Sequence, residues 1–327
     1  MPIPTGQNVP FTALRSEVRA GTNNPAAVPG PLGIPLNDAQ IRAFCFNPGP
    51  LPSTTQRSIG QARGVTFTRV VVSVNTSTYN MRDAVLAAGW PAAHRATTNC
   101  IINNGVNIYA PSVGAFSFNT GGGSWPASST ATVTVGTGAS IVAKGGPAGD
   151  GGSAAGPAIP NAQWTAGGAG TGGGTAMNIS LPTTIVNFGI IAGGGGGGGG
   201  GNGRRVAPAA SGGGGGGGGA SGFSTIGNAG QGGPGAPATV PQPGQNGTAG
   251  TFASPGGGTG GQNTPQPAPT RGGVGGNGGP WASSGQPGGQ GGLPGTQGPG
   301  AGAGGSAGAA FNNTPSVTYT GPGQRFG

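Results

Sequence analysis

Two uninterrupted glycine runs, Gly193–Gly201 and Gly212–Gly219, occupy the middle of the chain. Glycine has no side chain to bury, so these residues can join a folded structure only through their backbone amides and carbonyls. Around the runs, glycine recurs at every third residue in short phases, as at 146/149/152, 167/170/173 and 272/275/278. Collagen requires an unbroken Gly-X-Y phase, so phases this short exclude a collagen helix.

A threefold period is typical of the left-handed polyproline-II-like helix, which has three residues per turn and no internal hydrogen bonds. Each N–H and C=O in such a helix needs a partner on a neighbouring helix, and only glycine lets two axes approach closely. We therefore expect a polyglycine-II lattice with the two all-glycine runs at its centre and the one-sided triplets at its periphery. The alternative is a flexible linker, although a linker has no need of two matched runs.

Such a lattice needs a folded domain beside it. Ordering one backbone residue costs about 1–2 kcal/mol, whereas one lateral hydrogen bond contributes only about 0.5–1.5 kcal/mol. A single run therefore stays a coil, and only many aligned runs on a preformed seed can be stable. The predicted fold is accordingly mostly β and irregular, with short N-terminal helices, a small β-rich domain with one helix, and a C-terminal polyglycine-II helix sandwich.

Composition divides the chain into four predicted parts. They are an N-terminal helical docking region at 1–64, a β-rich domain at 65–143, a glycine-rich lattice with exposed loops at 144–310, and one closing strand at 311–327. In the first part, Leu14 and Val18 lie four residues apart on one short helix, and Ile41 and Phe44 share a face of another. These helices are too small to bury much surface alone, so we expect the four side chains to dock on a partner.

The β-rich domain is predicted from runs of β-branched residues. Strands are expected in the stretches 65–75, 100–110, 115–119, 130–135 and 139–143. One helix is expected over Tyr79–Trp90, with Met81, Val85 and Leu86 on one side and Gly89 ending it. The Asn104–Gly105 pair is a strong signal for a β-hairpin turn.

Residues able to carry catalysis are scarce. His94 is the only histidine, and the acidic residues are Glu17, Asp38, Asp83 and Asp150. No Ser-His-Asp set, carboxylate pair or metal-ligating cluster can be assembled from them, so we predict no enzyme, no cofactor and no metal site. The net charge is +9 but no basic run of five to eight residues exists, so no nucleic-acid partner is expected.

Cysteine usage and the N-terminus add little. Cys45 and Cys100 have no metal-ligand spacing, and two buried or unpaired thiols are favoured over a disulfide. The opening residues MPIPTGQNVPF have neither a charged start nor an apolar core, so no signal peptide is expected. An apolar run of about eighteen residues, as a membrane-spanning helix needs, is not found in the sequence.

Several stretches resemble a known group of proteins. The stretches are NVPFTALRSEVRAGTN, IPLNDAQIRAF, TSTYNMRDAVLAAGW, CIINNGVNIYA and VNFGIIAGGGGGGGGG. They are similar to glycine-rich tail proteins of tailed bacteriophages, and the glycine-rich part resembles the adhesin at the tip of T-even-type long tail fibres. The resemblance implies a virion protein of the phage tail, made in the host cytoplasm. Its partners would be other phage tail proteins, in several copies per particle, and a host outer-surface receptor, either lipopolysaccharide or an outer-membrane protein.

In that family, loops between glycine stretches contact the receptor. The loops at the corresponding positions here are Arg204–Ser211, Ala236–Asn246, Gln262–Arg271 and Pro280–Gln286. Arg204 and Arg205 would contact anionic lipopolysaccharide, and Arg271 and Trp281 would make cation–π and stacking contacts with a sugar. The structural alternatives are two solvated loop charges for the first pair, and partial burial of Trp281 at the lattice edge.

Other functions remain open at this point. A virion spacer or assembly protein without a receptor role would have the same composition. So would a secreted glycine-rich bacterial surface protein, although the N-terminal helical domain of the mycobacterial glycine-repeat class is missing. An ice-binding protein could use threefold glycine helices, but the outer positions here contain Gln and Pro rather than a flat Thr/Ala face.

Overall fold

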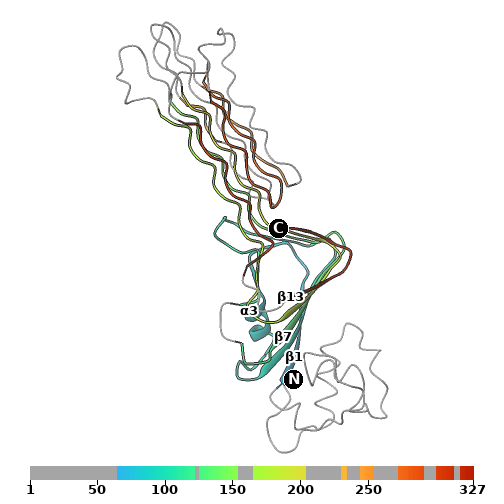
Figure 1. Cartoon of the computed structure of the whole chain (residues 1–327). Helices are drawn as coiled ribbons and strands as arrows, with labels where there is room; N and C mark the ends of the chain where they lie inside the picture. Colours follow the sequence, from blue (N-terminus) through green and yellow to red (C-terminus); the bar gives the residue numbers. More distant parts are fainter. Residues whose placement is uncertain are drawn as a thin grey trace, which may run out of the picture.

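The structure is a computed structural model of the 327-residue chain. It describes residues 65–121, 125–153, 165–203, 230–233, 244–252, 272–290, 300–312 and 317–327. The predicted docking residues Leu14, Val18, Ile41 and Phe44 lie outside these ranges, as do Cys45 and the second glycine run. Figure 1 shows two regions, a bundle of strands that carries one short helix and a set of extended glycine-rich segments that project from it.

The described part contains short strands and one helix. In chain order they are β1 (Val65–Val72), β2 (Thr76–Ser77), β3 (Tyr79–Asn80), α3 (Met81–Ala87), β4 (Arg95–Ile102), β5 (Asn107–Tyr109), β6 (Phe118–Asn119), β7 (Thr130–Val135), β8 (Ser140–Val142), β9 (Met177–Asn178), β10 (Thr183–Asn187), β11 (Ile190–Ala192), β12 (Phe311–Asn312), β13 (Val317–Thr320) and β14 (Gln324–Phe326). Over the described residues the fold is thus β-rich with one short helix, as predicted for the β-rich domain, while the predicted N-terminal helices lie outside these residues.

The strands form three parallel sheets. The first sheet has the order β1-β4-β7-β10-β13, the second β14-β11-β8-β5-β2, and the third β12-β9-β6-β3. The chain therefore visits the three sheets in turn and then starts again one strand further along, so successive passes stack as the coils of a parallel β-solenoid. Strands β9 to β14 join the same sheets as β1 to β8, so residues 177–192 and the described part of 311–326 share a core with 65–142.

Two expectations about turns are wrong. Asn104–Gly105 does not close a hairpin, because β4 pairs in parallel with β1 and β7, and β5 pairs in parallel with β2 and β8. Gly105 has a φ of +73°, which suits a corner between two sheets as well as a hairpin turn. The stretch 311–327, predicted as a single closing strand, holds three short strands, since β12 joins the third sheet and the chain bends at Gly321 (φ +100°) from β13 into β14.

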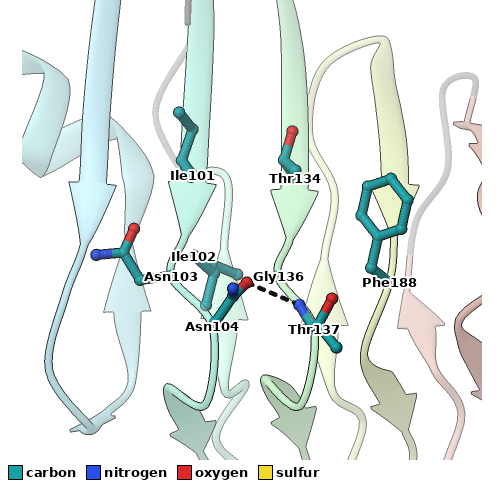
Figure 2. A pocket seen from close by; sticks show the side chains of 8 residues that line it. All are labelled: Ile101, Ile102, Asn103, Asn104, Thr134, Gly136, Thr137 and Phe188. Carbon is teal, nitrogen blue, oxygen red and sulfur yellow. Dashed lines mark hydrogen bonds between the residues drawn. The ribbon is translucent and has the colours of Figure 1, made fainter.

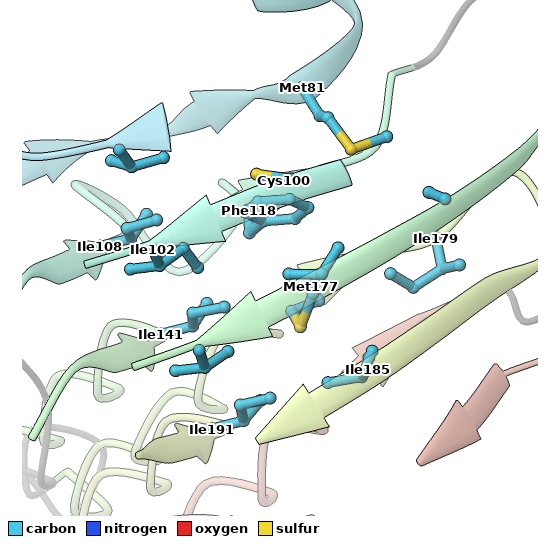
Figure 3. Close-up of a cluster of buried hydrophobic side chains, with 14 of the residues drawn as sticks. Met81, Cys100, Ile102, Ile108, Phe118, Ile141, Met177, Ile179, Ile185 and Ile191 are labelled. Atoms are coloured by element: carbon cyan, nitrogen blue, oxygen red, sulfur yellow. The ribbon is translucent and has the colours of Figure 1, made fainter. Parts of the chain in front are cut away.

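The core consists of side chains stacked in register from coil to coil. In the first sheet, one such row runs through Val70, Cys100, Val133, Ile185 and Tyr319. In the second sheet, the row is Ile108, Ile141 and Ile191, all fully buried. Figure 3 shows these isoleucines with Met177 and Phe118 inside the coil. Burying aliphatic rows on the inner face of every strand is the main stabilising contribution of this part.

The helix lies within its predicted stretch Tyr79–Trp90 but is shorter, since Tyr79–Asn80 form β3 and α3 spans Met81–Ala87. Asn80 caps α3, because its side-chain Oδ1 accepts hydrogen bonds from the backbone N–H groups of Arg82 (3.1 Å) and Asp83 (3.4 Å). Met81 and Val85 are buried against the sheets. The chain leaves the helix through Gly89, whose φ is +90°.

Cys100 is a buried free thiol, as expected. Burial in apolar surroundings raises the pKa of Cys100 to about 12, against a smaller opposing effect of the hydrogen bond to Tyr79. The thiol therefore stays protonated at physiological pH and serves as a small apolar core group.

Asn187 links the last two coils. Its Nδ2 donates to the Tyr319 hydroxyl (2.6 Å) and to the Gln324 carbonyl (3.0 Å), and its Oδ1 accepts from the Gly189 N–H (2.9 Å). The residue is fully buried. A buried amide with all these groups paired stabilises the corner, and removing it leaves the partners unpaired.

We expect Asn187→Ala to lower the free energy of unfolding by about 2–3 kcal/mol, because buried polar groups lose their partner. Urea unfolding of the purified chain measures this. Asn104→Ala is the matched control, since Asn104 is an exposed corner asparagine that accepts one hydrogen bond, from the Thr137 N–H. Equal losses for the two variants would contradict the stabilising role assigned to Asn187.

Candidate functional site

The glycine-rich segments are two insertions at one corner of the solenoid. Residues 143–176 connect β8 to β9, and residues 193–310 connect β11 to β12, so both insertions lie between the second and third sheets of consecutive coils. Neighbouring strands of a sheet are about 4.8 Å apart, so the two insertions leave the sheet side by side. The Ala143 N–H still donates to the Ala192 carbonyl (3.0 Å), one step beyond the paired strands.

Beyond that point the hydrogen bonds recur at every third residue. Gly146, Gly149 and Gly152 donate to the carbonyls of Gly195, Gly198 and Gly201, at 2.8–2.9 Å. Toward the antiparallel segment 165–176, Gly194, Gly197 and Gly200 donate to the carbonyls of Gly174, Thr171 and Gly168, at 2.8–3.0 Å. The three-residue spacing is the one expected for extended helices with three residues per turn.

Gly193–Gly201 lies at the centre of these segments. All nine residues are buried, and a Cβ added to any of them would lie within 3.0 Å of a backbone atom of another segment. Three successive residues of the run face three different segments, since Cβ atoms at 195, 196 and 197 would meet Gly279, Gly305 and Pro147, respectively. Backbone thus encloses this run on several sides, which is why no residue other than glycine fits there.

An outer segment has the complementary pattern. Over residues 272–280, two buried residues alternate with one exposed residue, and the exposed ones are Val274, Asn277 and Pro280. The buried positions of this segment are all glycine, and residues with larger side chains occur only where the segment faces solvent. This segment lies at the periphery, as its glycine spacing predicted.

The far end of the lattice is the end that lies away from the sheets (Figure 1). Residues 144–153 and 193–203 lead outward from the strands, and 165–176 and 300–310 lead back (Figure 1). Nine residues of such a helix extend about 28 Å. Arg204 and Arg205 directly follow Gly203 in the sequence, and Arg271 directly precedes Gly272, but all three lie outside the described residues.

Trp281 lies at the opposite end of the lattice, next to the sheets. The neighbouring Ala282 N–H donates to the carbonyl of Gly193, the first residue after β11 (3.1 Å). The Trp281 ring is partly buried and packs against Phe252 and Phe326, with centroid distances of 4.9 and 5.4 Å. These contacts support a packing role, and a receptor contact by Trp281 stays a prediction.

The Asp150 carboxylate takes part in the backbone network of this region. Asp150, near the far end, accepts a hydrogen bond at Oδ1 from the Gln231 N–H (2.8 Å). Among the residues that the structure describes, no three His, Cys, Asp or Glu side chains lie together as a possible metal site. Within the same ranges, no helix combines the length and the apolar character needed to cross a bilayer.

Comparison with known proteins identifies the family. A model of the phage tail fibre adhesin Gp38 family matches residues 67–327. The chain belongs to the phage tail fibre adhesins. This adhesin is therefore a component of the virion tail that acts in host attachment, which favours the sequence-based interpretation over a secreted surface protein or an ice-binding protein.

A solved structure shares the adhesin's fold. It is the crystal structure of the gp37–gp38 adhesin tip complex of the bacteriophage S16 long tail fibre, with a TM-score of 0.51 and 20% sequence identity. The similarity covers 97% of this chain and 96% of the other. A comparison with curated proteins finds no match.

Sequence reasoning missed the solenoid and the corner residues of this adhesin. A signal was present, because a β-branched strand, a short turn containing glycine and a second, short strand recur along the chain. The instances are IINNGVNIY, TVTVGTGASIV, TIVNFGIIA and TYTGPGQRF. Each marks the passage from the first sheet to the second, and Phe188 and Asn187 lie in one of them.

Proposed function

We propose that the glycine-rich segments form a polyglycine-II sandwich that holds receptor-contact loops away from the rest of the tail fibre. The observation that carries this proposal is the run Gly193–Gly201, which is enclosed by backbone. The run starts at the end of β11 and extends about 28 Å from the sheets. Because backbone atoms make the lattice bonds, loop sequences at its end can vary without changing the scaffold.

Three arginines are neighbours in sequence of the described segments that reach the far end of the lattice. The Gly273 N–H donates to the Asn202 carbonyl (2.9 Å), so residues 202 and 273 lie side by side at this end. Arg204 and Arg205 follow the first of these residues in the sequence and Arg271 precedes the second. Guanidinium groups bind phosphate through paired hydrogen bonds, so we propose anionic lipopolysaccharide as the receptor, with an outer-membrane protein as the alternative.

We also propose that residues 1–64 dock the adhesin on another tail-fibre protein through Leu14, Val18, Ile41 and Phe44. The S16 structure is a complex of gp38 with gp37, and the overall similarity to that structure supports an analogous partner here. Several adhesins per particle would multiply weak receptor contacts, because linked sites rebind before the particle escapes.

The double variant Arg204→Ser/Arg205→Ser tests the receptor contact. We expect phage carrying it to adsorb to host cells about tenfold more slowly, because charge-assisted hydrogen bonds to phosphate are lost. Adsorption is measured as the loss of free phage from suspension. Arg69→Ser is the matched control, since Arg69 is an exposed arginine on β1, far along the chain from the lattice loops.

The outcomes separate the candidate functions. The proposal is supported if the double variant adsorbs more slowly while Arg69→Ser adsorbs normally, and if soluble lipopolysaccharide abolishes adsorption of the unmodified phage. Normal adsorption even after replacement of the whole loop Arg204–Ser211 would instead favour a spacer without a receptor role.

A further inference from the structure

A groove of about 540 Å³ lies at the corner between the first and second sheets (Figure 2). Ile101 and Thr134 line it from the outer ends of β4 and β7, and Phe188 lines it from the turn after β10. The turns after β4 and β7 contribute Asn104 and Thr137. The groove lies on the solenoid, so it is separate from the glycine-rich loops, and nothing in the proposed receptor contact depends on it.

Phe188 presents an aromatic ring to solvent from a rigid backbone. Its side chain is 46% exposed, although both neighbours in the chain, Asn187 and Gly189, are buried. The Phe188 N–H donates to the Val135 carbonyl (2.9 Å), and the Asn187 Oδ1 accepts from the Gly189 N–H (2.9 Å). The turn is therefore held on both sides of Phe188, and the ring forms one wall of the groove.

The polar side of the groove is preorganised as well. The Asn104 Oδ1 accepts a hydrogen bond from the Thr137 N–H (2.9 Å), which orients the amide and leaves its NH₂ group for a ligand. A Cβ on Gly136 would lie within 3.0 Å of this Oδ1 and of the backbone of Asn104 and Ile102. Glycine at 136 thus makes the space that the amide of Asn104 occupies.

The lining selects among ligand classes. Every residue of the groove is uncharged, so it offers no counter-ion for a charged ligand. A peptide cannot add to the strands here, because β4, β7 and β10 are each already paired on both sides. A sugar ring has C–H faces that pack on apolar surfaces and hydroxyls that bond to amides and hydroxyls. Ile101 and Phe188 supply the apolar surface, and Asn104, Thr134 and Thr137 supply the polar groups.

We propose that this groove is a second binding site of the adhesin, for a short segment of a neutral glycan. One sugar ring stacks on Phe188, and its hydroxyls bond to Asn104 and Thr137 across the groove. Tail fibre attachment would then combine a weak glycan contact on the solenoid with the separate contact at the far end of the lattice.

Saturation-transfer NMR on the full chain tests the site with three neutral trisaccharides, maltotriose, cellotriose and chitotriose, and with an acidic trisaccharide of galacturonic acid. We expect at least one neutral trisaccharide to bind with an affinity in the millimolar range, and the acidic one not to bind. Phe188→Ala should weaken that binding roughly tenfold, and Thr134→Val should weaken it less while preserving strand shape.

Val74→Ala is the matched control, because Val74 is also a large exposed apolar residue (69%) and does not line the groove. Thermal unfolding of each variant checks that it is folded. Failure of all three neutral trisaccharides to bind would overturn the proposal, as would equal binding by folded Phe188→Ala or equal binding of the acidic sugar. Adsorption of phage with the Arg204→Ser/Arg205→Ser change has no bearing on this result, so the two proposals fail separately.

Discussion

Gly197→Ala is expected to lower the free energy of unfolding by about 3 kcal/mol or more, because the added methyl cannot be accommodated without moving backbone. A Cβ at 197 would lie within 3.0 Å of the Pro147 carbonyl and of the Ala148 nitrogen. Gly197 also donates to Thr171 and accepts from Gly305, so shifting it disturbs three neighbouring segments at once. The loss should appear as faster hydrogen exchange of lattice amides and earlier proteolytic cleavage between 144 and 310.

Gly300→Ala is the matched control within the lattice, and its expected effect has the opposite sign. A Cβ at 300 would have no atom within 4 Å, and its φ is not in the left-handed region. Replacing glycine by alanine there reduces the freedom of the unfolded chain, which raises stability by about 0.4–1 kcal/mol. If both variants were equally stable, the enclosed backbone at Gly197 would not be the source of lattice stability.

Ile185→Ala should cost about 2–5 kcal/mol, the range for removing a large aliphatic side chain from a packed interior. Ile185 is fully buried on β10, between Val133 of β7 and Tyr319 of β13 in one inward row. Since β10 directly precedes β11, the strand from which the longest insertion leaves, the loss should also loosen the glycine-rich segments. Denaturant unfolding with far-ultraviolet circular dichroism gives the free energy, and hydrogen exchange reports on the glycine segments.

Val186→Ala serves as the comparison on the same strand. Val186 is the next residue and faces outward, partly exposed, so its truncation should cost no more than about 1 kcal/mol. A similar loss at 185 and 186 would mean that the inward row does not carry the stability of the solenoid.

Local features of this chain were predictable because they depend on neighbours in sequence. The helix at Met81–Ala87 follows from its apolar spacing and from Gly89 after its end, whereas the Asn80 cap emerged only from the structure. Strand β7 at Thr130–Val135 follows from alternating β-branched residues. The buried, backbone-packed state of Gly193–Gly201 follows from the absence of side chains together with the threefold spacing around it.

The candidate site was predictable only in part. Glycine spacing indicated which segments are central, and the resemblance to phage adhesins indicated which loops would contact a receptor. Neither signal indicated at which end of the lattice a loop lies, and the turn at Trp281 and Ala282 lies beside the sheets. The groove at Phe188 combines residues from three successive coils, so its parts are tens of residues apart in the chain.

What the sequence by itself determined is therefore the conformation of each segment and the face it buries, since both follow from residue type and short-range period. Only the tertiary structure decided which strands pair, because alternation marks an inward face without naming its neighbour and Asn104–Gly105 suits a corner as well as a hairpin. The three-sheet solenoid also decided that both glycine insertions leave the same corner on consecutive coils. Because the two insertions start from neighbouring strands about 4.8 Å apart, their backbone amides can pair from the first residues of the lattice.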